Sequence, residues 1–138
     1  MHKALQLLGI ARVSGNIELG EDNAKALIKA GKARLLLLAC DASDGVKKRA
    51  EGYLYGFRTP MLELPFTKAE LGAAVGRAQC AVAAVRDLGL AGAVADALAA
   101  EYGARYAPIA QALDEKRKRQ ASRKAAKGGK TGKRRKSE

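Results

Sequence analysis

The residues from Gly20 to Asn23 have types that suit contact with the phosphates and base edges of a nucleic acid. A glycine lets the backbone approach a partner closely, and a helix N-terminus presents N–H groups and a partial positive charge to an anion. Asn23 can donate and accept hydrogen bonds at once, as reading a base edge requires. The alternative is a solvated helix start in which Glu21 and Asp22 complement the helix dipole.

Three lysines follow this turn at a spacing that places them on one face of the same predicted helix: Lys25, Lys29 and Lys32. The apolar residues of this helix fall on its other face. The lysines therefore either add phosphate contacts beside the turn or simply face water.

The segment from Gly76 to Gln79 is the second candidate for such contacts. Gly76 can turn the chain tightly, and Arg77 can stack on a base or clamp a phosphate. Ala78 lies between Arg77 and Gln79, and the whole segment equally fits an ordinary loop between a helix and a strand. Gly72 and Gly76 also have the GxxxG spacing, which we interpret as close packing followed by a helix C-cap.

Side chains that most often carry catalysis are scarce in this chain. The one histidine, His2, lies at a terminus that we expect to fray, so acid–base, triad and zinc roles have no candidate. Cys40 and Cys80 show no CxxC spacing, and we interpret both as buried thiols. The GxxxxGK[ST] and GxGxxG nucleotide-binding motifs are missing. We therefore predict no enzyme activity, no metal site and no cofactor.

Alternating helical and strand patterns predict the elements that hold these segments. Helices are expected over 3–12, 20–31, 44–57 and 90–102 and after a capping box at 67–70, with strands at 17–19, 33–40, 60–65 and 79–87. The two longest strand candidates are apolar on consecutive positions, which is typical of parallel strands covered on both sides. We therefore predict an α/β fold, a three-layer α/β/α sandwich with a small, mostly parallel four-stranded sheet.

Positive charge is concentrated at the C-terminal end of the chain. Of the net charge of +12, residues 115–138 contribute +10, because they hold twelve Lys and Arg residues against Glu115 and Glu138. Alanine is the only apolar residue type in this tail, so it cannot bury enough surface to fold alone. We predict a folded domain over 1–103, a connector of uncertain structure over 104–114, and a disordered Lys/Arg-rich tail over 115–138.

No stretch approaches the roughly 18 consecutive apolar residues of a membrane helix, and the apolar part of the N-terminus is too short for a secretory signal. We therefore expect a cytoplasmic protein with no membrane contact. The excess of basic residues indicates a polyanionic partner.

The order of three sequence stretches resembles the kink-turn-binding ribosomal protein superfamily, the seven-Ae type of large-subunit proteins, and most of all its bacterial ribosomal-protein-like branch. The stretches are LLGIARVSGN, GEDNAKALIKAGKARLLLLACDAS and TKAELGAAVGRAQCAVAAV. The resemblance implies the same sandwich fold and a site formed by Gly20 to Asn23 with Gly76 to Gln79. Where the family resembles G-T-N-E with a lysine six residues after the glycine, this chain has Gly20-Glu21-Asp22-Asn23 and Ala26, flanked by Lys25 and Lys29.

The resemblance and the residues together lead to the expectation of a non-catalytic, monomeric RNA-binding protein. Its target would be structured, kink-turn-like RNA, namely ribosomal RNA or a ribosome assembly intermediate, with the tail adding unspecific phosphate affinity. Two alternatives stay open. The chain is otherwise a protein-interaction module, or the RNA-targeting half of an RNA-modifying enzyme.

Overall fold

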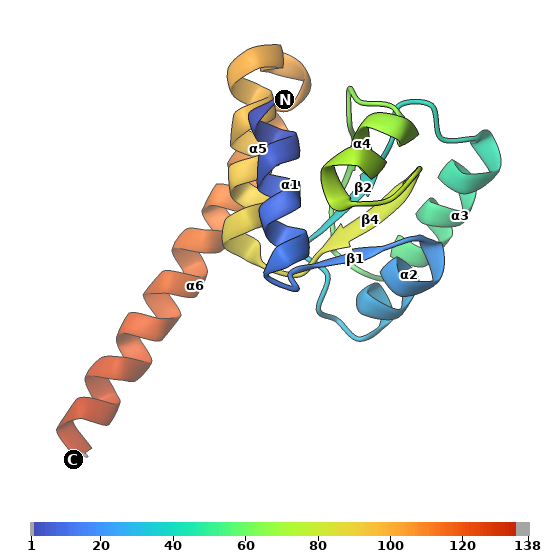
Figure 1. The fold of residues 1–138 in the computed structure, drawn as a ribbon. Helices are drawn as coiled ribbons and strands as arrows, with labels where there is room; N and C mark the ends of the chain where they lie inside the picture. Colours follow the sequence, from blue (N-terminus) through green and yellow to red (C-terminus); the bar gives the residue numbers. More distant parts are fainter. Residues whose placement is uncertain (1, 135–138) are drawn as a thin grey trace.

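The computed structural model describes residues 2–134, with the side chains of residues 2–123. Within these residues the chain forms six α-helices, a short 3-10 helix and four strands, and Figure 1 shows how they are arranged. In chain order they are α1 (Lys3–Val13), β1 (Ile17–Leu19), α2 (Glu21–Lys29), β2 (Leu35–Leu38), α3 (Asp44–Leu54), β3 (Met61–Glu63), α4 (Lys68–Val75), β4 (Val82–Val85), α5 (Leu88–Tyr102), η1 (Gly103–Arg105) and α6 (Ala107–Arg134). All four predicted strands and the five predicted helices are present.

Short-range capping interactions fix several helix starts. The predicted capping box is confirmed: Thr67 Oγ1 accepts from the Glu70 N–H at 3.1 Å, and Glu70 Oε1 accepts from the Thr67 N–H at 2.9 Å. Ser43 Oγ likewise accepts from the Val46 N–H at 3.2 Å and begins α3. Such caps satisfy backbone donors that the first helical turn leaves unpaired.

The sheet has the strand order β1-β4-β2-β3. The central strand β4 runs antiparallel to both β1 and β2, and only β2 and β3 are parallel. The sheet is therefore mixed, and the prediction of a mostly parallel sheet is wrong. An unbroken apolar run shows that both faces of a strand are buried, but it carries no information about strand direction.

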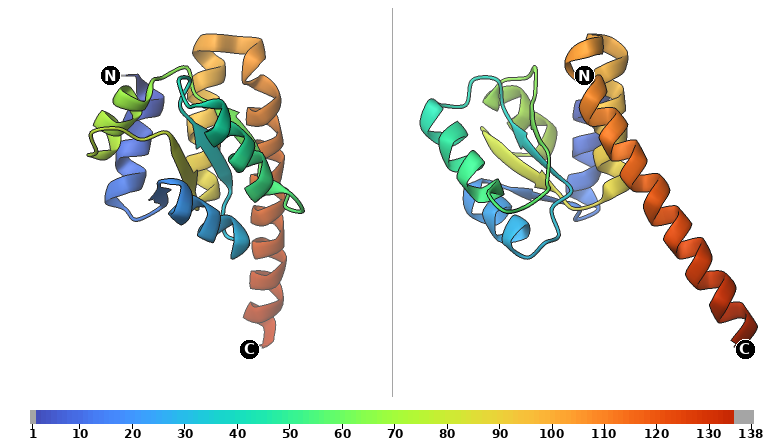
Figure 2. Two further views of the ribbon diagram at one scale, coloured as in Figure 1. Left: turned by 90° about the vertical axis from the view of Figure 1, so that its right-hand side faces the viewer. Right: turned by 180° about the vertical axis from the view of Figure 1, so that it is seen from behind.

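Two cores lie on opposite faces of the sheet, because neighbouring strand residues point to opposite sides. Leu35 and Leu37 of β2 join the core under α1, α4, α5 and the start of α6. Leu36 and Leu38 join the smaller core under α2 and α3. Figure 2 shows the resulting three layers, with α2 and α3 on one side of the sheet and α1 and α5 on the other.

The two thiols differ in their exposure. Cys80 is buried as predicted, but Cys40 is exposed. Cys40 follows β2 at the point where the chain leaves the sheet toward α3, so the apolar run before it does not carry its side chain into the core.

The C-terminal segment, predicted as a connector over 104–114 and a disordered tail over 115–138, is helical within the described residues, and its division into connector and tail stays a prediction. Helix α6 begins at Ala107 and continues to Arg134, while residues 135–138 lie outside the described part of the chain. Alanine, lysine, arginine and glutamine favour helix, and Asp114 pairs with Arg117 and Lys118 one turn ahead. Tyr106, at the end of η1, and Leu113 are buried in the larger core. The predicted domain end at residue 103 stays a prediction.

Figure 1 shows α6 packing beside α5 and then extending away from the body on the side opposite α2 and α3. No helix within residues 2–134 is long and apolar enough to cross a membrane.

Candidate nucleic-acid interface

The turn between β1 and α2 is built on Gly20. Its φ of 89° is a conformation that favours glycine, and it is the N-cap of α2 without a side-chain hydrogen bond to the helix start. The Gly20 N–H donates to the Val82 carbonyl at 2.9 Å, which fixes the turn to the start of β4. The first turn of α2 therefore has a defined position and no side-chain cap over it.

The segment from Gly76 to Gln79 is exposed and is held tightly against α4. Gly76 ends α4 in a left-handed conformation, with φ 78° and ψ 30°. The Arg77 N–H donates to the Gly72 carbonyl at 2.8 Å, and a Cβ on Gly72 would lie 2.7 Å from the Arg77 carbonyl oxygen. The interpretation of Gly72 and Gly76 as a close-packing position and a C-cap is confirmed.

The two predicted segments lie close to Cys80, at the end of the sheet where β4 begins: the Gly20 N–H and the Cys80 thiol both donate to the Val82 carbonyl, at 2.9 Å and 3.3 Å. Burial raises the pKa of the Cys80 thiol, while the backbone of Gly20, the charge of Arg77 and the backbone of Val82 act against that rise. Gly20 and Arg77 thus approach the same buried side chain from separate segments. The fold therefore brings together residues that are more than fifty positions apart in the sequence.

Asn23 is exposed, and part of its hydrogen-bonding capacity is used within the chain. Its Nδ2 donates to the Leu19 carbonyl at 3.0 Å, so the amide ties the first turn of α2 to the end of β1. The side-chain carbonyl and the second N–H of the amide have the capacity for further hydrogen bonds.

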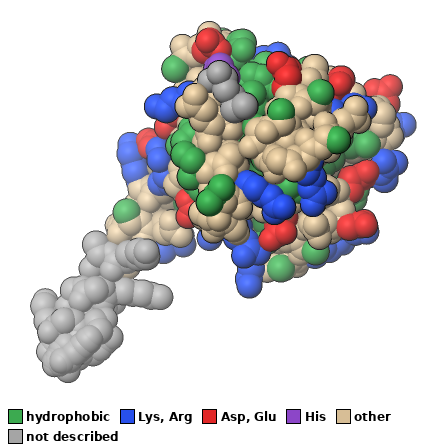
Figure 3. All heavy atoms as spheres, viewed as in Figure 1, with side chains coloured by type: hydrophobic (Ala, Val, Ile, Leu, Met, Phe, Trp, Pro, Cys, Tyr) green, Lys and Arg blue, Asp and Glu red, His purple; other side chains and the backbone are tan. Residues whose placement is uncertain are grey.

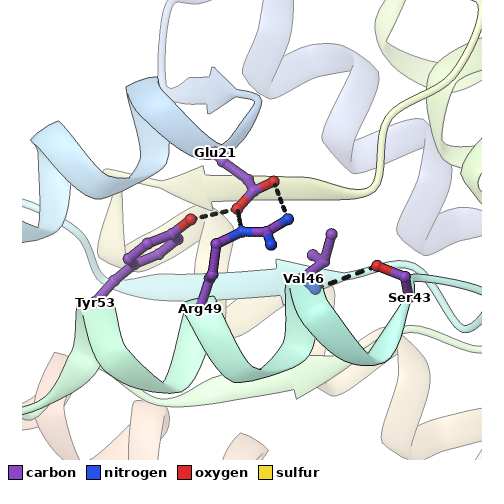
Figure 4. Close-up of polar contacts among 5 residues, drawn as sticks. All are labelled: Glu21, Ser43, Val46, Arg49 and Tyr53. Carbon is purple, nitrogen blue, oxygen red and sulfur yellow. Dashed lines mark hydrogen bonds and ion pairs between the residues drawn. The ribbon is translucent and has the colours of Figure 1, made fainter.

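Glu21 is turned toward α3, as Figure 4 shows. Its carboxylate accepts two hydrogen bonds from Arg49, Nε to Oε1 at 2.8 Å and Nη2 to Oε2 at 3.0 Å, and Tyr53 Oη also donates to Oε1. These bonds from Arg49 and Tyr53 lower the pKa of Glu21 to about 2. The carboxylate of Glu21 is thus occupied by Arg49 and Tyr53.

Two shallow hollows border α2. One, of about 420 Å³, is lined by Glu21, Asp22 and Lys25 together with Arg49 and Tyr53. In it, Lys25 Nζ lies 5.8 Å from the centre of the Tyr53 ring, within the range of a cation–π contact.

The other hollow, of about 300 Å³, has Asn23 and Lys32 in its lining, beside Glu18 and Arg86. Arg86 Nη2 and Glu18 Oε2 form an ion pair at 3.6 Å. Lys29 is exposed and lines neither hollow.

The sequence analysis missed Arg49 and Tyr53. Their spacing of four residues puts them on one face of a helix, but nothing in the sequence links that face to Glu21, which lies 28 residues before Arg49. A contact of this kind depends on how α2 and α3 cross.

The chemistry of the site is that of hydrogen bonding and charge. Among the described side chains, no group of three or more His, Cys, Asp or Glu residues has the arrangement of a metal site. Figure 3 shows Lys and Arg side chains interspersed with Asp and Glu on the face that Figure 1 presents. The helix start, the loop and the lysines offer donors to a polar, anionic surface.

Comparisons with known proteins bear on the family. No protein-family model matches the chain. Over 75 residues, 54% of its length, it is 33% identical to the RNA-binding protein YlxQ of Enterococcus faecium, and this stretch covers 72% of that relative.

Solved structures share the fold. A protein of unknown function from Bacillus halodurans matches with a TM-score of 0.66 and 26% identity, over 71% of this chain and 98% of the other. The 15.5 kD RNA-binding protein of Giardia lamblia matches with a TM-score of 0.58 over 79% and 85% of the two chains. At 22% identity, its likeness concerns the fold alone.

Proposed function

This chain belongs to the YlxQ family of ribosomal-protein-like RNA-binding proteins, within the L7Ae-like superfamily, and on that premise we propose that it is a non-catalytic RNA-binding protein. The observation that carries the proposal is the meeting of two segments around Cys80. There the uncapped start of α2 and the Gly76–Gln79 loop lie at the end of the sheet where β4 begins, with Gly20 and Cys80 bonded to the same Val82 carbonyl. A backbone rich in N–H donors beside an arginine suits RNA phosphates and base edges.

We further propose that the preferred RNA is structured and sharply bent, of the kink-turn type, and that it belongs to ribosomal RNA in the cytoplasm. Asn23 supports a base contact, because its amide is exposed and already fixed in position by Leu19. Arg77 supports a phosphate or stacking contact from the opposite segment. Glu21 does not contact RNA in this proposal, since its carboxylate is occupied by Arg49 and Tyr53.

Two substitutions test the proposed contacts of Asn23 and Arg77 with RNA. We expect Asn23→Ala to weaken binding of a kink-turn RNA by about 1 to 3 kcal/mol through loss of a base contact, and to leave a straight duplex of the same strands unaffected. Arg77→Ala should weaken binding of both RNAs, and it should weaken binding of the bent RNA more than binding of the straight duplex. Gel shifts measure the affinity of each variant for both RNAs, and the ratio of the two affinities shows whether the preference for bent RNA is lost.

The matched control is Asp22→Ala, which changes the neighbouring exposed residue of the same turn. Equal affinity of the wild type for bent and straight RNA would contradict the kink-turn preference and leave generic RNA binding. Failure of the wild type to bind either RNA would favour the protein-interaction alternative.

A further inference from the structure

The basic residues at the start of α6 fall into two groups with different surroundings. Arg117 Nη2 lies 3.0 Å from Asp114 and 3.5 Å from Asp96 of α5, and its guanidinium packs where a Cβ on Gly92 would stand. Lys118 Nζ lies 3.3 Å from Asp114. These two cations are neutralised, and Arg117 docks α6 on α5.

The second group, Lys116, Arg119 and Arg123, faces the body instead. With Arg34, Leu88 and Gln120, these residues line a cleft of about 240 Å³. Within residues 2–123, no carboxylate lines this cleft or forms an ion pair with any of its cations. Positive charge is therefore collected here without a counter-charge from the body.

Hydrogen bonds to the body anchor two of the residues that line this cleft. The Arg34 N–H donates to the Val85 carbonyl at 2.7 Å, which anchors the start of β2. Lys116 Nζ donates to the Arg58 carbonyl at 3.4 Å, in the connection between α3 and β3 that runs beside α6 in Figure 2. Burial lowers the pKa of Lys116, and the charges of Arg119, Arg34 and Arg58 lower it further. An anion in the cleft would offset this mutual repulsion.

The chemistry of the lining indicates which anion fits. Arginine guanidinium groups bind phosphate oxygens in pairs of hydrogen bonds, and three arginines surround the cleft. No aromatic residue lines it, so it offers no platform on which unpaired bases would stack. Lys116, Arg119 and Arg123 follow helical spacing, and the sequence continues this spacing with Lys127, Lys130 and Arg134.

We propose that this cleft is a second RNA-contact surface, which holds the sugar–phosphate backbone of the RNA at the end of the sheet opposite the Gly20 turn. The Gly20 N–H donates to the Val82 carbonyl, and the Arg34 N–H donates to the Val85 carbonyl. Val82 and Val85 are the two ends of β4, and at strand spacing they lie about 10 Å apart. The inference rests on the proposed function and adds to it a site shared by the body and α6. It differs from a generally basic tail because Arg34 belongs to the folded body.

The test compares neighbouring charges of the full-length protein. We expect Arg119→Gln and Arg34→Gln each to weaken binding of both bent and straight RNA about five- to tenfold and to lower the salt slope of log affinity by about 0.7 to 0.9. Lys118→Gln, which removes the same charge one residue away, should stay within about twofold because its cation is already paired. The double variant Arg34→Gln/Arg119→Gln should lose less than the product of the single losses, because the two side chains share phosphates.

Equal losses of RNA affinity for Lys118→Gln and Arg119→Gln would overturn the proposal that the cleft binds RNA. So would an unchanged RNA affinity of Arg34→Gln in a protein that unfolds normally. So would a polyglutamate competitor that displaces the wild type as well as unlabelled RNA does, since the surface would then fit an acidic protein. The cleft is judged by losses common to both RNAs, whereas the proposed reading site is judged by their affinity ratio. The two can therefore fail separately.

Discussion

Glu21 shows how one side chain organises the candidate interface. Its carboxylate joins the first turn of α2 to Arg49 and Tyr53 of α3, so the turn is held in place before any partner binds. Side chains on rigid, pre-positioned elements lose less entropy on binding. Glu21 is thus a positioning residue for the Gly20 turn.

This role predicts a pH dependence of stability. The folded pKa of about 2 lies below the ordinary value of 4.5, so Glu21 stabilises the fold above about pH 5 and loses this effect as the pH falls toward 2. Because the Arg49 side chain is 56% exposed, we expect Glu21→Gln to lower the free energy of unfolding by only about 1 kcal/mol at pH 7.

Urea unfolding of both proteins at pH 7, 5 and 3 measures the difference. Asp22→Asn is the control, since it removes the same charge at the next, exposed position. A difference between wild type and Glu21→Gln that stays constant down to pH 3 would count against the ion pair.

At the scale of elements, α4 and the loop after it depend on the missing side chain of Gly72. A Cβ there would meet the backbone of Arg77 at 2.7 Å and of Gln79 at 2.9 Å, and backbone atoms cannot turn aside as a flexible side chain does. The close approach holds the Gly76–Gln79 loop in its place. Local packing in α4 therefore determines one half of the candidate interface.

We expect Gly72→Ala to lower the free energy of unfolding by about 1 to 3 kcal/mol through overpacking, and to weaken RNA binding by shifting Arg77. Gly52→Ala is the matched control. It lies in α3 with nothing within 4 Å of the added Cβ, so it should raise stability by about 0.5 to 1 kcal/mol. Thermal unfolding measures the stability of both variants. A Gly72→Ala protein as stable as the wild type would contradict the tight contact of Gly72 with the backbone of Arg77 and Gln79.

The elements could be predicted from the sequence where short-range signals define them. Thr67 and Glu70 indicate the start of α4, and Ser43 the start of α3, because caps act over three residues. The direction of β4 could not be predicted, since its burial on both faces is the same in either direction. The contact of Glu21 with Arg49 and the cleft at Arg34 depend on how distant elements pack, which no local pattern encodes.

At the scale of the whole molecule, the larger core includes residues that follow Gly103. Tyr106 is 2% exposed and its hydroxyl donates to the Glu63 carbonyl at 2.8 Å, while Leu113 is fully buried. These residues cover the larger core from the C-terminal side. The body and the first turns of α6 should therefore unfold together.

Two truncations test this arrangement. A chain of residues 1–114 keeps Tyr106 and Leu113 and should unfold cooperatively near the wild-type temperature. A chain of residues 1–103 should be less stable by several kcal/mol, at roughly 1.5 to 3 kcal/mol for each large buried side chain removed. Calorimetry of both chains measures this, and equal unfolding temperatures would place the domain end at residue 103 after all.

The outer strands of the sheet, β1 and β3, are three residues long, and Pro60 and Pro65 stand close to the two ends of β3. An open strand edge is a template on which another chain can add a strand, and long apolar edges lead to aggregation. Here each edge offers few unpaired backbone groups, and the prolines contribute no N–H donor. The short outer strands and the prolines beside β3 therefore limit self-association of the protein through its sheet.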